Sequence, residues 1–233
     1  MKKLVVITGT DTGAGKTLLT ALLLAHLRSE GHRTLAMKPF ASGNTADADL
    51  FDRLQGGELP RPLLSPFFFR APLAPMIAAR LEHRKIRLAD TTTKILQAHQ
   101  HCDLLLVEGC GGLMAPLGDD FDLIDILKAL QPGVIVCARN KLGVLNHVRL
   151  THSALTHNGL ALTAVVLMSV AKPDLSADTN AAVIRELNLA KMVLELPYLG
   201  RVGRRHDVIR THARRLRGPL SGLAALLTSQ SLP

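Results

Sequence analysis

A strand, a glycine-rich turn and a helix near the N-terminus constrain the fold of this chain most strongly. Residues 4–7 form an apolar run, and the turn that follows ends in Gly15-Lys16-Thr17, where a leucine-rich helical pattern begins. In such a turn, backbone N–H groups and the positive end of the helix dipole face inward and bind polyphosphate oxygens. We expect Lys16 to reach the β- and γ-phosphates of a nucleotide and the Thr17 hydroxyl to bind Mg²⁺.

The spacing of this loop differs from the usual G-x-x-x-x-G-K-[ST] pattern. Thr10 stands where the first glycine is expected, and Gly9 lies one residue early. A chance Gly-Lys-Thr in a flexible turn is the alternative, but the strand before it and the helix after it favour a variant phosphate loop. The residues predicted to bind the nucleotide here are Thr12, Gly13, Ala14, Gly15, Lys16, Thr17 and Leu18.

Short apolar runs alternate with helical patterns along the rest of the chain, which is typical of a doubly wound, mainly parallel α/β sheet. With 233 residues, the chain has the length of one such domain, so we predict a single domain of the P-loop NTPase type over residues 1–233. Residues 59–76 are rich in proline and are expected to form a long irregular connection. The patterns predict strands at 33–38, 103–107, 134–138, 161–167 and 191–196, and helices at 16–29, 76–81, 91–101, 123–130, 145–157 and 178–187.

The composition and the sequence patterns indicate the cellular location of the protein and the partners to expect. The sequence has no stretch of about 18 uninterrupted apolar residues, and its N-terminus enters a strand pattern instead of a signal-peptide pattern. We therefore expect a cytoplasmic protein without a membrane partner. Three widely spaced cysteines, Cys102, Cys110 and Cys137, are expected to be reduced thiols.

The basic charge is concentrated at the C-terminus. The whole chain has a formal net charge of +9, and residues 201–233 contain seven arginines and a single acidic residue, Asp207. A basic segment of this kind is more often a solvated surface than a binding site for nucleic acid or acidic lipid. We expect the solvated surface, and no nucleic-acid partner.

Polar residues at predicted strand ends give the next site candidates, because ligands of such sheets bind at the carboxyl ends of the strands. Lys38 ends the strand at 33–38 and is a candidate for neutralising an anionic substrate. Asp47 and Asp49 lie at the start of a helical pattern, where one carboxylate could complete a magnesium shell. Stabilisation of the helix dipole explains both acids equally well, and the sequence does not choose between them.

The strand at 103–107 leads directly to Glu108 and a glycine-rich loop. Glu108 is placed like the second acidic element of a P-loop ATPase, which holds Mg²⁺ directly or through water. Gly109, Gly111 and Gly112 would let backbone N–H groups approach an anionic ligand. Asn146 stands near a predicted helix start that suits a carboxylate ligand, although helix capping is the commoner role for such a residue.

Taken together, these motifs resemble the dethiobiotin synthetase family, which acts in biotin synthesis. The resemblance runs in family order over residues 4–200, and the Thr-Asp-Thr form of the loop is its most specific part. The matching pieces are Gly9-Thr10-Asp11-Thr12, Gly15-Lys16-Thr17, Lys38-Pro39, Ser42-Gly43, Ala74-Pro75, Val107-Glu108-Gly109, Gly111-Gly112, Leu142-Gly143, Asn146-His147 and Leu196-Pro197.

The resemblance implies an ATP- and Mg²⁺-dependent ligase reaction. Diaminopelargonic acid takes up CO₂ as a carbamate, ATP phosphorylates the carbamate, and the neighbouring amine closes a cyclic urea. By motif position, Lys16 and Lys38 would stabilise the phosphoryl and carbamate charges, and Ser42 would contact the substrate. The metal ligands would be Thr17, Glu108 and Asp47 or Asp49. Asp47 fits the family's Asp-Ala helix start better, while Asp49 stays open because the loop before it is short.

The remaining implied contacts lie on the glycine-rich loop and on later segments. Gly109 and Gly111 would bind substrate, and Asn146 would receive the substrate carboxylate across a homodimer interface. The implied nucleotide contacts beyond the phosphate loop are Glu108, Gly109, Cys110, Gly111, Pro197, Tyr198 and Leu199.

Three features depart from the family pattern. Met168-Ser169 stands where the family commonly has an asparagine for the base, Cys110 replaces an alanine or glycine, and residues 201–233 match poorly. The main alternative is a dimeric ATP-dependent switch of the partitioning type, which uses a lysine early in the loop, where this chain has Asp11. Amidotransferase-type ligases are a second alternative, but they need a glutaminase domain that this chain lacks.

Overall fold

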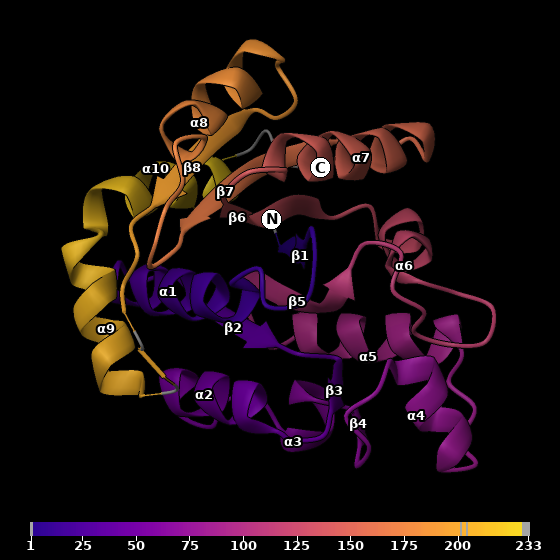
Figure 1. Cartoon of the computed structure of the whole chain (residues 1–233). Coiled ribbons are helices and arrows are strands. Elements are labelled where there is room, and N and C mark those ends of the chain that lie inside the picture. Colours follow the sequence, from indigo (N-terminus) through magenta and orange to yellow (C-terminus); the bar gives the residue numbers. More distant parts are fainter. Residues whose placement is uncertain (1, 201, 204, 230–233) are drawn as a thin grey trace.

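A six-stranded, all-parallel sheet forms the centre of the computed structural model, which describes residues 2–200, 202–203 and 205–229 (Figure 1). The strand order is β2-β5-β1-β6-β7-β8. Register is set by apolar runs that are buried on both faces, as Val5 opposite Leu106 and Ile7 opposite Ile135 illustrate. The predicted doubly wound α/β fold is therefore confirmed. The strands are β1 (Lys3–Gly9), β2 (Thr34–Met37), β3 (Phe40–Ser42), β4 (Phe67–Phe69), β5 (Leu104–Gly112), β6 (Gly133–Asn140), β7 (Leu162–Ser169) and β8 (Met192–Leu196).

Helices cover both faces of the sheet. Right-handed crossovers place α1 on one face and α5 to α8 on the other, and α9 and α10 return to the face of α1, which both contact. None of the helices in the described ranges is long and apolar enough to span a membrane. The helices are α1 (Lys16–Ser29), α2 (Ala46–Gln55), α3 (Arg61–Leu64), α4 (Pro75–Leu81), α5 (Leu88–His99), α6 (Leu123–Leu130), α7 (Val144–His157), α8 (Ala177–Glu186), α9 (His206–Arg215) and α10 (Arg217–Thr228).

Two local predictions need correction. The segment 59–76 is not wholly irregular, because it contains α3 and β4, and β4 pairs in parallel with β3. Phe67 stacks on Phe40 with ring centroids 5.1 Å apart, so apolar packing gives this segment regular structure. Likewise, the glycines after Glu108 do not form a separate loop, since β5 continues to Gly112 through an irregularity in its pairing with β1.

The described part of the C-terminal segment is folded, which the charge pattern alone did not predict. α9 and α10 bury one apolar side each, including Ile209, Leu220, Leu223 and Leu227, while their arginines remain exposed. The partner surface is α1, whose leucines are buried around most of its circumference. A helix that is apolar on nearly all sides needs cover on the side away from the sheet, and α9 and α10 supply it.

Candidate active site

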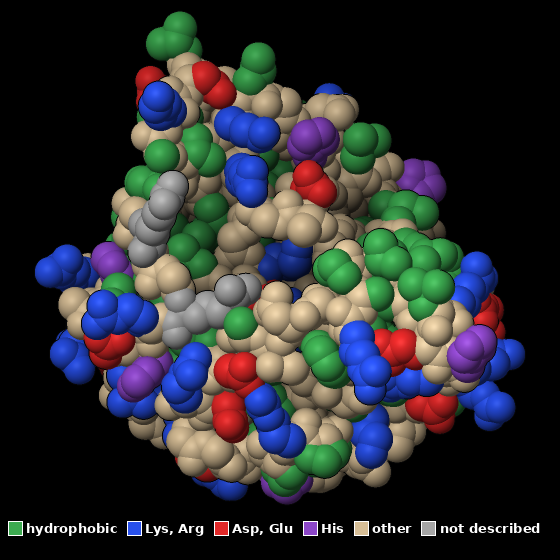
Figure 2. Space-filling view, turned by 60° about the horizontal axis from the view of Figure 1, so that its bottom comes forward, with side chains coloured by type: hydrophobic (Ala, Val, Ile, Leu, Met, Phe, Trp, Pro, Cys, Tyr) green, Lys and Arg blue, Asp and Glu red, His purple; other side chains and the backbone are tan. Residues whose placement is uncertain are grey.

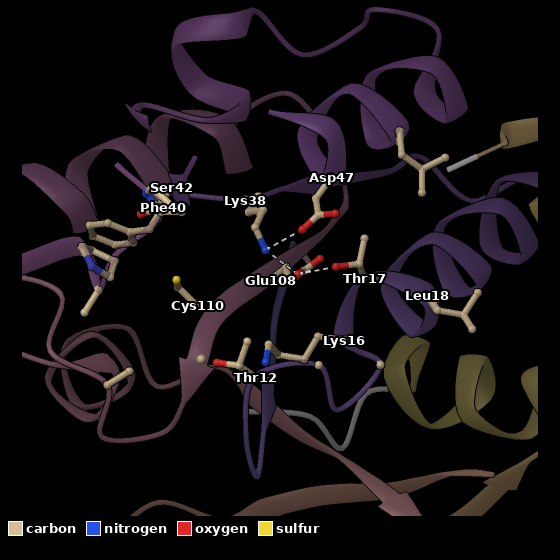
Figure 3. Close-up of a pocket in the computed structure, with 18 of the residues that line it drawn as sticks. Thr12, Lys16, Thr17, Leu18, Lys38, Phe40, Ser42, Asp47, Glu108 and Cys110 are labelled. Carbon is tan, nitrogen blue, oxygen red and sulfur yellow. Dashed lines mark hydrogen bonds and ion pairs between the residues drawn. The ribbon is translucent and has the colours of Figure 1, made fainter. Parts of the chain in front are cut away.

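A cavity of about 1050 Å³ lies at the carboxyl ends of β1, β2 and β5. The phosphate loop forms one wall. Lys38, directly after β2, and Glu108, in the middle of β5, form the floor between this loop and α2 (Figure 3). One face of the molecule is hollowed near its centre, with basic side chains visible inside the hollow (Figure 2). The sequence-predicted residues that line the cavity are Thr12, Gly13, Gly15, Lys16, Thr17, Leu18, Lys38, Ser42, Asp47, Glu108, Cys110 and Gly111.

The phosphate loop owes its shape to two glycines in left-handed conformations. Gly13 has a φ of 73° and Gly15 has a φ of 104°, values that residues with a side chain rarely adopt. A Cβ atom at Gly15 would also lie only 2.9 Å from Cγ of Met168 on β7. The loop is thereby packed against the neighbouring strand end, and α1 begins directly after it at Lys16.

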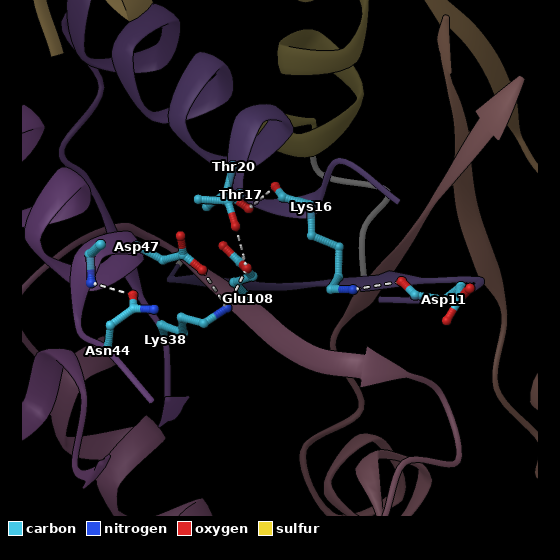
Figure 4. Close-up of polar contacts among 9 residues, drawn as sticks. Asp11, Lys16, Thr17, Thr20, Lys38, Asn44, Asp47 and Glu108 are labelled. Atoms are coloured by element: carbon cyan, nitrogen blue, oxygen red, sulfur yellow. Dashed lines mark hydrogen bonds and ion pairs between the residues drawn. The ribbon is translucent and has the colours of Figure 1, made fainter. Parts of the chain in front are cut away.

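Lys16 folds back over this loop. Its Nζ donates a 2.9 Å hydrogen bond to the backbone carbonyl of Asp11, which keeps the ammonium group above the turn (Figure 4). Burial is the main cause of a lowered pKa for Lys16, and the nearby Lys38 lowers it further, while Glu108 opposes the shift. An ammonium group in this position gains stabilisation when anionic phosphate oxygens arrive.

A buried polar network lies beside Lys16. Glu108, which is 1% exposed, accepts hydrogen bonds at Oε1 from the Thr17 hydroxyl at 2.8 Å and from Lys38 Nζ at 2.5 Å. Lys38 Nζ also forms an ion pair with Asp47 Oδ2 at 3.2 Å. Polar groups from four parts of the chain thus meet at one point (Figure 4). They come from α1, α2, β5 and Lys38 at the end of β2.

Lys38 is charged in this network. Burial disfavours its ammonium form, but the carboxylates of Glu108 and Asp47 outweigh that penalty and raise the pKa of Lys38. Lys38 therefore carries a positive charge into a site where the phosphate loop and Lys16 are already placed for anions. The arrangement suits stabilisation of negative charge shared between two anionic groups.

The oxygen donors near Thr17 fit a magnesium ion. Mg²⁺ prefers one or two carboxylates and keeps its remaining positions for water and phosphate oxygens, and the Thr17 hydroxyl, Glu108 and Asp47 offer such a set. Glu108 Oε2 is buried and has no hydrogen-bond partner among the described residues, so it retains capacity for a ligand. In the part of the chain that the structure describes, no group of three His, Cys, Asp or Glu side chains could hold a metal ion by itself. This fits an ion that is held largely by the nucleotide and by water.

The choice between Asp47 and Asp49 is now visible in the geometry. Asp47 lines the cavity and contacts Lys38. Asp49 does not line it, and its carboxylate is instead bound by Arg61 and by the Thr45 hydroxyl at 2.9 Å. Burial raises the pKa of Asp49, but these hydrogen bonds and the charge of Arg61 together outweigh it and lower the pKa overall. The structure therefore favours Asp47 as the candidate ligand and gives Asp49 a role at the start of α2.

The wall of the cavity away from α1 carries no charged side chains among Ser42, Phe40 and Cys110 and is partly apolar. Ser42 Oγ is buried without a hydrogen-bond partner among the described residues, in a wall that also includes Phe40 and Cys110 (Figure 3). Burial is the main cause of a raised pKa for the Cys110 thiol, which keeps it in the neutral form. An orphaned hydroxyl in a partly apolar wall is suited to orienting an organic substrate.

Several predicted site residues lie outside the cavity lining. Ala14 is buried, with its carbonyl accepting a 3.2 Å bond from the Cys137 thiol. Asn146 is exposed on α7. The others that do not line it are Asp49, Gly109, Pro197, Tyr198 and Leu199.

The lining also contains residues that the sequence interpretation did not assign to the site. Most of them are apolar or glycine, without chemistry of their own to mark them, but Ala74-Pro75 belonged to the recognised family motifs. Three come from the C-terminal segment, which was expected to be solvated. The added lining residues are Phe40, Leu50, Pro72, Leu73, Ala74, Pro75, Ala115, Gly200, Val202, Gly203 and Ile209.

Comparison with known proteins agrees with this geometry. A family model described as an AAA domain matches residues 3–206. An ATP-dependent dethiobiotin synthetase of Anaeromyxobacter sp. (strain Fw109-5) is 37% identical over 88% of this chain and 94% of its own length. The synthetase of the same name from Bacillus subtilis (strain 168) is 32% identical over 78% of this chain and 81% of its own.

A solved structure gives the same architecture at low sequence identity. The crystal structure of a ParA family ATPase from Chlorobium tepidum TLS aligns with a TM-score of 0.53 over 92% of this chain and 98% of that one. The two sequences are 14% identical, so this likeness concerns the fold alone.

Proposed function

This chain belongs to the ATP-dependent dethiobiotin synthetase family, and we propose that it uses ATP and Mg²⁺ to close a cyclic urea from diaminopelargonic acid and CO₂. The products are dethiobiotin, ADP and phosphate. The observation that carries the proposal is the convergence of Lys16, Lys38 and Glu108 on one cavity at the strand ends. The reaction joins two anions, a carbamate and a terminal phosphate, so two ammonium groups at that point address its main electrostatic barrier.

We assign nucleotide binding to the phosphate loop. Backbone N–H groups from Thr12 to Leu18 would hold the β- and γ-phosphates at the start of α1, and Lys16 would exchange its bond to the Asp11 carbonyl for a phosphate oxygen. The strand-end segment Pro197–Leu199 would contact the nucleoside part. Its neighbour Gly200 lines the cavity, which supports that placement.

Thr17, Asp47 and Glu108 would hold the magnesium ion. Bound with the nucleotide, Mg²⁺ supplies positive charge that stabilises the transferring phosphoryl group. Glu108 and Asp47 would then serve both the ion and Lys38, because Lys38 Nζ contacts both carboxylates. In this role they keep Lys38 protonated and directed toward the cavity.

We assign Lys38 and Ser42 to the carbamate and the diamine. The Lys38 ammonium would neutralise the carbamate while it attacks the γ-phosphate, and the Ser42 hydroxyl would orient the substrate. Gly109 and Gly111 would offer backbone N–H groups on the same side. The second amine of the substrate closes the ring and displaces phosphate, so no side-chain nucleophile is needed.

The assembly is also part of the proposal. We propose a cytoplasmic homodimer in which Asn146 of one protomer receives the substrate carboxylate of the other. The exposure of Asn146 on α7, between the exposed Leu142 and Leu150, supports a contact surface there. We further propose that residues 1–233 act as one domain, since the described part of the C-terminal segment packs on α1.

The deciding experiment is ADP release by the purified full chain with ATP and Mg²⁺. We expect turnover only when both the diamine and bicarbonate are present, with one urea ring formed per ADP. A partitioning-type switch hydrolyses ATP without either compound. ADP release that ignores both the diamine and bicarbonate would therefore exclude the ligase assignment and favour the switch.

A further inference from the structure

A second, smaller pocket lies beside α9 and is distinct from the strand-end cavity. It has a volume of about 330 Å³ and is formed where the last turns of α1 and α2 meet α9. Three arginines line it, one from α1 and two from α9, and the other lining side chains are small or apolar. The lining residues are Ala25, Arg28, Ser29, Leu54, Gly56, Arg210, Ala213 and Arg214.

The arginines of this pocket are only partly neutralised. Arg28 is paired with Glu58 at 2.5 Å and donates a second bond to the Thr34 carbonyl at 3.1 Å. Arg210 makes a single, long bond of 3.3 Å to the Leu54 carbonyl. Arg214 has neither an ion pair nor a hydrogen bond among the described residues. The three arginines and Glu58 together leave a net charge of +2 on the pocket.

Capping of helix ends does not account for this charge. Arginines near helix C-termini commonly bind the last carbonyls, and Arg210 does so for α2. Each guanidinium group nevertheless carries five N–H donors, and one bond uses little of that capacity. Arg210 and Arg214, four residues apart on α9, lie on the same side of the helix, so their remaining donors face one volume.

We propose that this pocket binds a small phosphate-bearing anion of diphosphate size. Paired guanidinium groups match phosphate oxygens through parallel N–H···O bonds, and the volume is at the lower end of the range for small-molecule sites. A concave pocket whose two guanidinium groups keep most of their N–H donors unused suits a compact anion better than a nucleic-acid backbone, which needs an extended basic surface.

The pocket is separate from the strand-end cavity but shares two helices with it. α1 begins at Lys16 in the phosphate loop, and its last two residues, Arg28 and Ser29, line the basic pocket. On α9, Ile209 lines the large cavity and the next residue, Arg210, lines the small one. The basic pocket does not depend on the proposed ligase activity, and its test is a binding measurement.

The test is a calorimetric titration of the full chain with sodium diphosphate in metal-free buffer. Because we also assign phosphate binding to the phosphate loop, we expect two sites in the wild type. The Lys16→Ala variant should retain one site, and the Arg210→Gln/Arg214→Gln variant should retain the other. In a Lys16→Ala background, the two arginine substitutions should weaken diphosphate binding by at least about tenfold.

A matched control carries the same change of charge. Arg149→Gln/Arg215→Gln removes two exposed arginines that do not line the pocket, and its diphosphate affinity should stay within about twofold of the parent. Equal loss in the two double variants would reveal a general charge effect and overturn the proposal. So would a Lys16→Ala protein that binds no diphosphate.

Two further ligands identify the source of the anion. Binding of ADP at the Arg210–Arg214 site would indicate a nucleotide, whereas binding of diphosphate without ADP would indicate a free anion, and both support a phosphate site. A single-stranded DNA 20-mer provides the competing interpretation. If it binds more tightly than diphosphate and loses affinity equally in both double variants, α9 presents a nucleic-acid surface and the pocket proposal fails.

Discussion

The strand-end cavity and the C-terminal helices are both rich in basic side chains, but they use them in opposite ways. In the cavity, Lys16 and Lys38 are buried, and each is held by named oxygen atoms. On α9 and α10 the arginines are exposed, and the buried residues are apolar ones such as Ile209 and Leu223. The comparison teaches that burial and partners, rather than the number of charges, distinguish the candidate active site from the exposed basic surface.

This difference predicts where substitutions act. A buried ammonium group contributes to chemistry because its charge acts in a medium of low polarity. The charge of a solvated arginine is screened by water, so it contributes little to the stability of the fold. We therefore expect charge removal in the cavity to lower the reaction rate, and apolar truncation in the C-terminal helices to lower the free energy of unfolding.

Replacing Lys38 should have the largest effect. Lys38→Met keeps the length of the side chain but removes the ammonium group, and we expect kcat for ring closure to fall by about 10³-fold. ADP affinity should change by less than about threefold because the phosphate loop is untouched. Steady-state assays and ADP titration measure the two quantities. The exposed Lys85 supplies the control, Lys85→Met, and turnover in Lys38→Met close to that of the control would contradict the assignment.

Truncating the buried side of α10 should have the next largest effect, on stability alone. Leu223 is fully buried, so Leu223→Ala should lower the free energy of unfolding by ~3 kcal/mol. Urea denaturation followed by circular dichroism measures it, with Arg215→Gln as the surface control, expected within about 0.5 kcal/mol of the parent. If the two variants unfold alike, α10 does not contribute to the core. Below the melting transition, kcat of Leu223→Ala should match the wild type.

Removing the Thr17 hydroxyl should have a smaller effect, confined to metal-dependent binding. We expect Thr17→Val to weaken ATP binding by about 10- to 100-fold with Mg²⁺ present, and by much less in EDTA. Thr20→Val, one turn further along α1, is a close control because the Thr20 hydroxyl is buried and, among the described residues, bonds only the Lys16 carbonyl. Equal losses with and without Mg²⁺ in Thr17→Val would indicate a packing defect instead of a lost metal ligand.

The same contrast explains what could be predicted from sequence. The phosphate loop, Lys38 and Glu108 follow from local patterns, because a parallel sheet brings the carboxyl ends of its strands together. The choice between Asp47 and Asp49 did not follow, since it depends on Arg61, which binds Asp49 from a different helix. That contact is set by tertiary packing and has no local signature.

The C-terminal helices were missed although the sequence contained a signal for them. The run 18–27 of α1 is apolar on nearly every side, and Leu19, Leu22 and Leu24 are all fully buried. The sheet covers only one side of such a helix, so a second layer had to exist. The arginines of 201–233 alone indicated only a solvated surface and left open whether the segment folds.

Arg139 combines the exposure of the α9 arginines with a contact to the phosphate loop. Replacing it should have the smallest effect on the kinetics. It is exposed, like the arginines of α9, yet its Nε donates a 2.8 Å hydrogen bond to the Gly13 carbonyl of the phosphate loop. If contact with the loop matters more than exposure, Arg139→Gln should raise KM for ATP by about threefold and leave kcat unchanged, because the loop loses a support but no catalytic group. The exposed Arg87, which directly precedes α5, makes no such contact within the described residues, so Arg87→Gln should leave both constants at the wild-type values. Identical kinetics for the two variants would mean that exposure alone decides the role of a charge, even beside the nucleotide.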